Sequence, residues 1–320
     1  MKKLLGSRWA LGAALAAAAA FPFLAQAVEQ PYLVRVAGVI GLFMILGLGL
    51  NFTLGYAGLF DLGFISFYAI GAYTTAIAMR AHVPAPLAIV LAVAITLAMR
   101  ALLGLTILRL RGDYLAVVTM GFGEIARLVI NNLDSLTNGP KGMQVRPWRP
   151  LACISPDPNV QYYLLILAGV SLAVVASRRI ESSRVGRAWV AIREDEVAAR
   201  LSGIPVREYK LLAFTLSAAF AGLAGALFAL WEQFVTPESF VFWESVLVVS
   251  IVVLGGMGSI AGVLLGALIL VGLPPLMQWT LSAEWINYRY LFFGLILVLA
   301  TLFRPQGLLP SARRESELSS

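Results

Sequence analysis

The chain alternates long apolar runs with short polar segments. A bilayer core is about 30 Å thick and a helix rises about 1.5 Å per residue, so one crossing needs roughly 20 apolar residues. The runs are rich in Leu and Ala and lack the apolar–polar alternation of barrel strands, so they predict helices. Ten candidate spans cover residues 9–28, 33–53, 59–79, 86–108, 114–132, 161–179, 210–231, 243–257, 259–280 and 287–303. Only Gly255–Gly258 separates the eighth from the ninth, so 243–280 forms either two full spans or segments that tilt or re-enter the membrane.

The amino-acid composition also indicates a helical membrane protein. Of the 320 residues, 60% are hydrophobic and 13% are charged, whereas soluble proteins average about 25% charged residues. These figures exclude a soluble fold, and they exclude intrinsic disorder because disordered chains are polar. The predicted fold class is therefore all-α: a polytopic helical membrane protein with about 10 transmembrane helices, in the range 8–10.

Few residues of this chain could form a disulfide, a metal site, a nucleotide site or a catalytic site. One Cys cannot form an intramolecular disulfide, and a lone histidine, His82, cannot form a histidine metal cluster. The phosphate-binding pattern G-x-x-x-x-G-K-S/T does not occur, and no Lys follows the glycines at 255–258. The sequence therefore predicts no cofactor, no metal, no catalytic residue and no nucleotide site of its own.

The distribution of basic residues predicts which side of the membrane the loops and the termini face. With ten spans, sixteen Lys and Arg residues fall on the face that carries both termini and six on the other, and eight of the sixteen lie between Arg178 and Lys210. Because basic loops stay on the cytoplasmic side, both termini are expected in the cytoplasm. The net charge of +7 then faces anionic lipid and does not indicate nucleic acid.

The N-terminus allows two interpretations. Lys2 and Lys3, an apolar stretch and Ala25-Gln26-Ala27 resemble a cleaved signal peptide. The apolar stretch is longer than a usual signal core and the cleavage-like site lies late. We expect a retained first helix within an N-terminal segment 1–32, with cleavage as the alternative.

The longest cytoplasmic loop covers residues 181–207. Its segment Arg193–Arg200 suits a short amphipathic helix, in which Glu196 and Arg200 form a favourable i,i+4 pair. Gly203 is placed to end that helix, and Pro205 prevents it from resuming. Such a helix is either a docking element for a cytoplasmic partner or a solvated connector held at the lipid headgroups.

Small residues recur at four-residue spacing in two apolar runs. Gly258, Gly262 and Gly266 form one such set, and Ala218, Gly222 and Ala226 form another, with Ala221 and Gly225 beside the second. Small residues on one helix face let membrane helices approach closely. The pattern predicts tight helix packing.

Charged residues inside spans are candidates for function. Glu124 and Arg127 are three residues apart and can pair on one helix face, while Asp61 begins the third run and Arg100 lies within the fourth. Each allows two interpretations. Glu124 and Arg127 either neutralise each other or take part in translocation, and Arg100 either functions within the membrane or extends to the cytoplasmic interface.

Several sequence blocks follow one another in a recognisable order. They are Asn51–Leu59, Gly63 with Ile70–Tyr73, Leu110–Thr119, Glu124–Arg127, Leu136–Gly142, Ser183–Ala188, Ala191–Glu196 and Val253–Ser259. Together they resemble the branched-chain amino acid ABC importer permeases of the LivM type, and the resemblance covers roughly residues 35–305.

The resemblance implies a role for the cytoplasmic loop. Permeases of this class contact their ATPases through a motif written EAA-x-x-x-G, and Ala198, Ala199 and Gly203 keep its small pair and glycine, although Val197 replaces the glutamate. The implied ATPase-coupling residues are Arg193, Glu194, Asp195, Glu196, Ala198, Ala199 and Gly203. The implied domains are a permease unit 33–305 of ABC importer permease fold, with the coupling loop 181–207, and a cytoplasmic tail 306–320.

The resemblance also implies partners and a mechanism. A periplasmic binding protein would deliver the cargo, two ABC ATPase subunits would supply energy, and a sister permease of the LivH type would pair with this chain in the bacterial inner membrane. The permease would act by alternating access and break no covalent bond. The alternatives are urea or short-chain amides as cargo, an ion-coupled secondary transporter, or a membrane scaffold that transports nothing.

Overall fold

The structure is a computed structural model that describes residues 17–25, 30–107, 112–149, 157–280 and 307–309, with the single residues 294, 298 and 302. Apart from these three single residues, the predicted span 287–303 lies outside the described residues. Residues 9–16 and 26–28 of the first predicted span and the single cysteine, Cys153, lie outside them as well. The predicted all-α class is confirmed, because helices dominate the described residues and several are long and apolar enough to cross a membrane.

Most predicted spans coincide with one helix each. After a helix at 17–25, the long helices are α3 (Pro31–Leu50), α4 (Phe64–Arg80), α5 (Ala85–Ile107), α6 (Asp113–Asn132), α8 (Pro158–Glu181), α11 (Val206–Glu232), α12 (Phe242–Gly255) and α13 (Ile260–Thr280). Within the described ranges six helices are long and apolar enough to cross a membrane, and Ile260–Pro275 is a shorter apolar helix. The predicted count of about ten spans is therefore not confirmed. The division of 243–280 at the glycine cluster is confirmed, because α12 ends at Gly255 and α13 begins at Ile260.

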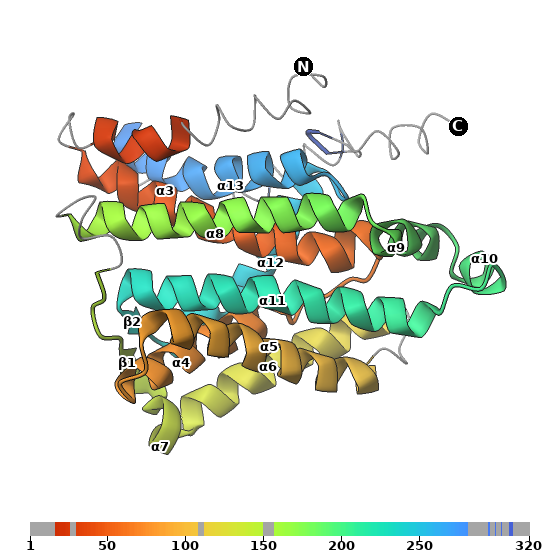
Figure 1. Cartoon of the computed structure of the whole chain (residues 1–320), viewed down its shortest axis with the longest axis horizontal. Helices are drawn as coiled ribbons and strands as arrows, with labels where there is room; N and C mark the ends of the chain where they lie inside the picture. Colours follow the sequence, from red (N-terminus) through yellow and green to blue (C-terminus); the bar gives the residue numbers. More distant parts are fainter. Residues whose placement is uncertain are drawn as a thin grey trace.

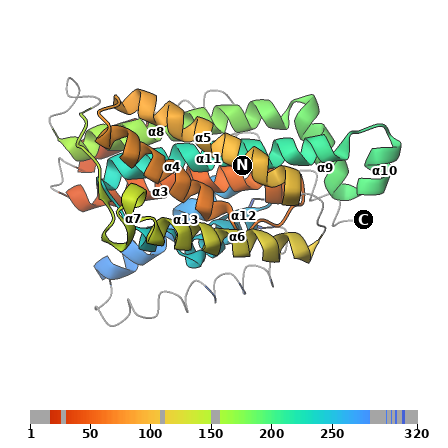
Figure 2. The ribbon, with the colours of Figure 1, turned by 90° about the horizontal axis from the view of Figure 1, so that it is seen from below.

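Short elements connect the helices. They are the π-helical turn η1 (Asn51–Tyr56), α7 (Asp134–Thr137), η2 (Gly139–Lys141), α9 (Arg184–Glu194), α10 (Glu196–Leu201) and η3 (Pro237–Phe240). Two short strands, β1 (Met143–Gln144) and β2 (Phe234–Val235), pair antiparallel with Met143 opposite Val235. This pair and α7 lie at one end of the bundle, and α9 and α10 project from the opposite end (Figure 1; Figure 2).

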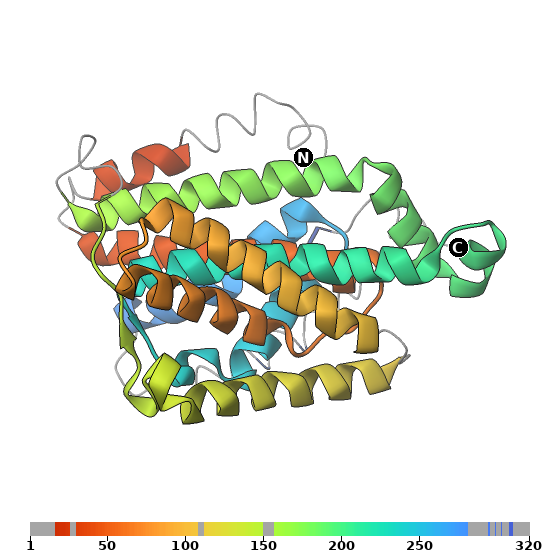
Figure 3. The same ribbon diagram turned by 60° about the horizontal axis from the view of Figure 1, so that its bottom comes forward.

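Helix α11 is the centre of the bundle. It packs against α4 and α5 and also against α3 and α8, while α12 and α13 pack on α3. Helix α6 lies along the outer edge, where α4 is a main neighbour (Figure 3). Large apolar side chains on α5 and α6 therefore remain exposed in the single chain, among them Val90, Leu102, Val117 and Ile125.

Glycines allow the central helices to touch through their backbones. A Cβ atom at Gly71 would collide with the backbone of Gly222, and one at Gly225 would collide with the backbone of Tyr68. On α13, Gly262 lies in the same way against the backbone of Gly255 of α12, and Gly266 lies against the backbone of Ile251. These contacts explain how α4 and α11, and α12 and α13, lie close along their length.

One predicted packing residue is placed differently. The four-residue spacing put Gly258 on a helix face with Gly262 and Gly266, but α13 begins only at Ile260. Gly258 has a φ of 80°, in the left-handed region that glycine adopts readily, and it belongs to the turn that joins α12 to α13. That part of the packing prediction is wrong, because spacing does not reveal where the backbone must turn.

The close backbone contact between α4 and α11 gives a stability prediction. Gly225→Ala should lower the free energy of unfolding by about 1–3 kcal/mol, because the new methyl group meets backbone atoms that cannot move aside. Unfolding by SDS in mixed micelles measures the loss. Gly121→Ala on α6 is the matched control, since nothing lies within 4 Å of a Cβ atom there. Equal free energies of unfolding for the two variants would contradict the close backbone contact of α4 and α11 at Gly225.

Candidate coupling and translocation sites

The projecting loop contains two helices and not one. The sequence predicts a single helix over Arg193–Arg200, but α9 ends at Glu194 and α10 begins at Glu196. Asp195 between them is extended, with φ of −153° and ψ of 111°. Its Oδ1 accepts hydrogen bonds from the backbone N–H groups of Val197 at 2.7 Å and Ala198 at 3.0 Å. The prediction is wrong because an aspartate cap starts a new helix at this point.

The end of α10 agrees with the sequence prediction. Gly203 has a φ of 82°, its N–H donates to the Arg200 carbonyl at 3.0 Å, and the N–H of Ile204 donates to the Ala199 carbonyl at 3.1 Å. These two bonds form a Schellman motif, which needs a left-handed residue at this position. The predicted pair is also present, with Arg200 Nη2 3.1 Å from Glu196 Oε1. The other carboxylate oxygen of Glu196 lies 2.7 Å from Lys210 Nζ.

Helix α10 carries an apolar contact surface that sequence reasoning missed. Val197 is 66% exposed and Leu201 is 84% exposed, and their i,i+4 spacing places them on one face. Ala199 instead is buried with Ile192 and Val206. Glu194 and Ala198, which the resemblance assigns to coupling, are exposed. The loop thus presents two large aliphatic side chains beyond the bundle, a signal present in the sequence as Val-x-x-x-Leu.

Helix α9 is anchored to the bundle through two polar contacts. The indole N–H of fully buried Trp189 donates to the Tyr209 carbonyl at 2.7 Å. Arg193 Nη1 donates to the Gly55 carbonyl at 2.6 Å, and its side chain lies against Gly58, whose φ is 68°. The projecting loop is therefore tied to the π-helical turn at the end of α3.

The π-helical turn also contacts the break between α12 and α13. Asn51 Oδ1 accepts a hydrogen bond from the Gly258 N–H at 2.8 Å, although the two residues lie 207 positions apart. Next to this contact, the N–H groups of Leu308 and Leu309 donate to the Leu254 and Gly255 carbonyls at 2.8 and 3.0 Å. One short segment, Asn51–Gly58, thus joins the projecting loop to the α12–α13 break.

Asp61 and Arg100 form a buried ion pair. Both side chains are inaccessible to solvent, and the Arg100 guanidinium also lies over the rings of Phe67 at 4.3 Å and Phe214 at 4.2 Å. The interpretation that Arg100 extends to the interface is wrong, because a guanidinium without access to water needs a charged partner and here finds one. The pairing itself was not predicted.

Glu124 and Arg127 form the predicted i,i+3 pair, in which Arg127 Nε lies 3.1 Å from each carboxylate oxygen. The pair faces outward, since the Glu124 side chain is 46% exposed and that of Arg127 is 28% exposed. The apolar residues of the same helix, Val117 and Ile125, are exposed as well. This face of α6 therefore presents a charged pair within a membrane-spanning helix.

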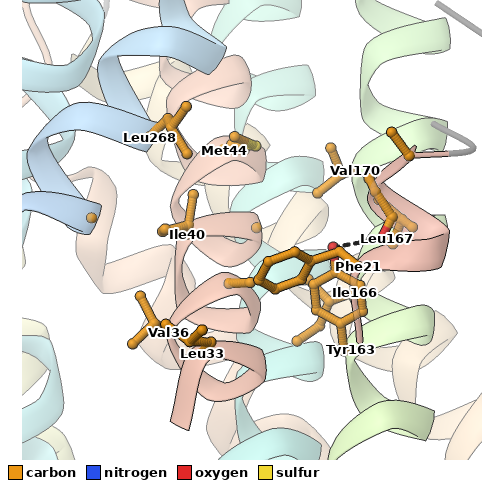
Figure 4. A pocket seen from close by; sticks show the side chains of 15 residues that line it. Phe21, Leu33, Val36, Ile40, Met44, Tyr163, Ile166, Leu167, Val170 and Leu268 are labelled. Atoms are coloured by element: carbon orange, nitrogen blue, oxygen red, sulfur yellow. Dashed lines mark hydrogen bonds between the residues drawn. The ribbon is translucent and has the colours of Figure 1, made fainter. Parts of the chain in front are cut away.

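An apolar cavity of about 650 Å³ lies between the helix at 17–25, α3, α8 and α13. Its walls are aliphatic and aromatic, and Phe21 faces Tyr163, whose hydroxyl donates to the Ala18 carbonyl at 3.0 Å (Figure 4). Among the described residues, no group of three His, Cys, Asp or Glu side chains could hold a metal ion.

Comparison with known proteins gives consistent matches. The family described as "Branched-chain amino acid transport system / permease component" matches residues 32–301. The chain is 41% identical over 330 residues to the high-affinity branched-chain amino acid transport system permease protein LivM of Escherichia coli K12, covering 93% of this chain and 76% of the relative. It is 33% identical over 158 residues to LivH of Salmonella typhimurium, covering 49% of each. The archaeal relative, a probable LivM of Methanocaldococcus jannaschii, is 25% identical over 236 residues, covering 70% of this chain and 68% of the relative. No solved structure matches.

The buried pair gives a second stability prediction. Arg100→Met should cost about 3–5 kcal/mol of unfolding free energy, because Asp61 then stays buried without its cation. The double variant Asp61→Asn with Arg100→Met should recover most of that loss in the same SDS titration. Arg35→Ala is the control. It breaks a 2.7 Å pair with Glu232 whose arginine side chain is 60% exposed, so the cost should stay below about 1 kcal/mol. A similar cost for Arg100→Met would contradict the prediction.

Proposed function

The chain belongs to the branched-chain amino acid transport permease family, and from this premise we propose that it is the membrane-spanning subunit of an ATP-driven importer of branched-chain amino acids. It is a multi-pass membrane transport subunit and not an enzyme. The observation that carries the proposal is the projecting pair α9–α10, tied through Arg193 to the bundle. Such an element suits a transporter that receives its energy from another subunit.

We propose the partners from the family and from this geometry. Relatives named LivM and LivH both match the chain, which supports pairing with a sister permease of the LivH type. The chain contains no phosphate-binding motif, so two ABC ATPase subunits would hydrolyse the ATP. A periplasmic binding protein would deliver the amino acid. Urea or a short-chain amide is the alternative cargo, but the names of the relatives favour branched-chain amino acids.

The proposed coupling runs from α10 to the α12–α13 break. The ATPase would bind the exposed Val197 and Leu201 and move the loop 181–207. Because Arg193 is bonded to the Gly55 carbonyl and Asn51 to the Gly258 N–H, the movement reaches η1 and the break through direct contacts. The ATPase would act on α9 and α10. These two helices and their ends contain the remaining predicted coupling residues: Glu194, Asp195, Glu196, Ala198, Ala199 and Gly203.

The proposed translocation surface includes the outer face of α6. A charged pair facing lipid at mid-span is costly, so polar groups at this depth face protein or water. We therefore place Glu124 and Arg127 toward the sister permease, at or near the pathway. This placement leaves the apolar faces of α5 for lipid.

Orientation and domain limits stay as proposed from the sequence. The end that carries α9 and α10 contains the basic cluster between Arg178 and Lys210, which favours the cytoplasmic side of a bacterial inner membrane. Both termini would lie on that side. The permease unit would cover 33–305, between the N-terminal segment 1–32 and the tail 306–320.

The docking proposal is tested at Leu201. Leu201→Glu should abolish uptake and copurification of the ATPase, because a charge replaces the most exposed aliphatic side chain of α10. The amount of permease in the membrane should not change, since Leu201 supports no buried contact. Leu201→Met keeps an apolar side chain of similar volume, so it should retain both uptake and copurification of the ATPase. Normal uptake by Leu201→Glu would reject docking at this surface, and isolation of the wild type as a functional lone transporter would reject the ABC mechanism.

The two interpretations of Glu124 and Arg127 are tested by exchanging the residues. The double variant Glu124→Arg with Arg127→Glu keeps an ion pair and should fold, but it reverses the charges presented by α6. We expect uptake to fall at least about tenfold while membrane abundance remains. The control exchanges the exposed pair of Arg35 and Glu232 in the same way and should transport normally. Full uptake by the α6 variant would show that the pair only neutralises itself.

A further inference from the structure

A second cavity lies beneath the projecting loop. It measures about 290 Å³ and opens between α9–α10, the segment 57–60 and the first turn of α6. Unlike the apolar cavity between α3, α8 and α13, its exposed lining is mostly polar. The proposed coupling uses two of its lining residues, Arg193 and Glu196, but assigns the cavity no ligand.

The lining combines charges of both signs with an aliphatic wall. Arg193 and Lys210 supply cations, and Glu196 supplies a carboxylate. The apolar part includes the buried Leu59, Leu115 and Ile192, together with Ala57 and the exposed Phe60. Lys210 and Glu196 form an ion pair of 2.7 Å at the cavity, which the carboxylate and ammonium group of a ligand would have to share. A ligand that matches this set carries a carboxylate, an ammonium group and a branched aliphatic group.

We propose that this cavity binds a free aliphatic α-amino acid from the cytoplasmic side, and that the bound amino acid slows further transport. The carboxylate would meet Arg193 and Lys210, and the ammonium group would meet Glu196. The side chain would lie against Leu59 and Leu115. The choice of ligand and of membrane side rests on the proposed function. The cavity adjoins the end of α6 at Leu115, so cargo leaving along that helix would reach it.

The position of the cavity explains why a ligand would slow transport. Of the lining residues, Arg193 and Glu196 belong to the loop that the ATPase is proposed to move, whereas Leu59 and Leu115 belong to the bundle. A ligand that contacts both the loop and the bundle stabilises the arrangement in which they lie close. Moving the loop then also requires breaking those contacts, so accumulated product opposes the next cycle.

The experiment uses the complete importer in proteoliposomes, with ATP inside and loaded binding protein outside. Initial uptake of labelled L-leucine is measured after the lumen is preloaded with unlabelled L-leucine, L-leucinamide, N-acetyl-L-leucine or inorganic phosphate. Internal L-leucine at millimolar concentration should lower the rate at least about fivefold, the lower end of typical allosteric coupling. L-leucinamide lacks the carboxylate, N-acetyl-L-leucine lacks the ammonium group, and phosphate supplies an anion alone, so all three should have little effect.

Two variants locate the effect in the cavity. Lys210→Met removes a cation, and Leu115→Phe fills the aliphatic wall, so both should transport at a rate independent of internal leucine. Leu105→Phe is the matched control on exposed α5 and should respond like the wild type. Each rate is divided by the rate of the same variant without internal amino acid, so a change in basal uptake does not affect the comparison.

Binding is measured separately from transport. Saturation-transfer NMR of L-leucine with the complete complex in nanodiscs, without ATP or binding protein, should give a signal for the wild type and none for Lys210→Met. The inference is overturned by equal signals, by uptake that internal leucine does not slow, or by equal slowing with phosphate or N-acetyl-L-leucine. Absence of any leucine uptake by wild-type liposomes would instead reject the proposed cargo, and the NMR result would still decide the site.

Discussion

A chain inside a bilayer cannot leave backbone amide and carbonyl groups unpaired, because lipid offers them no hydrogen bonds. Among the described residues, the π-helical turn η1 and the glycine break before α13 both depart from the regular α-helix. They solve the problem together, since Asn51 accepts from the Gly258 N–H and Arg193 donates to the Gly55 carbonyl. The two irregular segments are thus hydrogen-bonded to each other, and η1 is also hydrogen-bonded to the loop that is proposed to move it.

The two intramembrane ion pairs illustrate different consequences of burial. Asp61 and Arg100 lie between helices, away from water, and removing either partner would strand a charge. Such a pair fixes which segments meet, here the turn after η1 and α5, and contributes little net stability. Glu124 and Arg127 pair within one helix and face outward, so they hold no elements together. Their position therefore points to a surface completed by another subunit or by water.

The sequence predicted those features that depend on neighbouring residues. Apolar run lengths located α3, α5, α6, α8 and α11, the glycine cluster located the break at Gly255, and i,i+3 or i,i+4 spacing located the pairs at Glu124 and Glu196. Contacts between distant residues were not predictable, because no spacing rule joins Asp61 to Arg100 or Gly55 to Arg193. The helix start at Asp195 was missed for a local reason: an i,i+4 pair indicates a helix without showing where it begins.

The sizes of the side chains divide the bundle into tightly and loosely attached parts. At Gly71, Gly222 and Gly225 the backbones of α4 and α11 touch, and such an interface cannot slide without collision. Helix α6 also approaches the bundle closely, since a Cβ atom at Gly63 would collide with the Thr119 carbonyl. Helix α9 instead meets the bundle mainly through the hydrogen bonds of Trp189 and Arg193. Discrete polar contacts can break and reform as units, whereas interlocked backbones move as one body. Under the proposed alternating access, the α4–α11 block would move as one piece, while rearrangement would concentrate where α9 meets η1 through single hydrogen bonds.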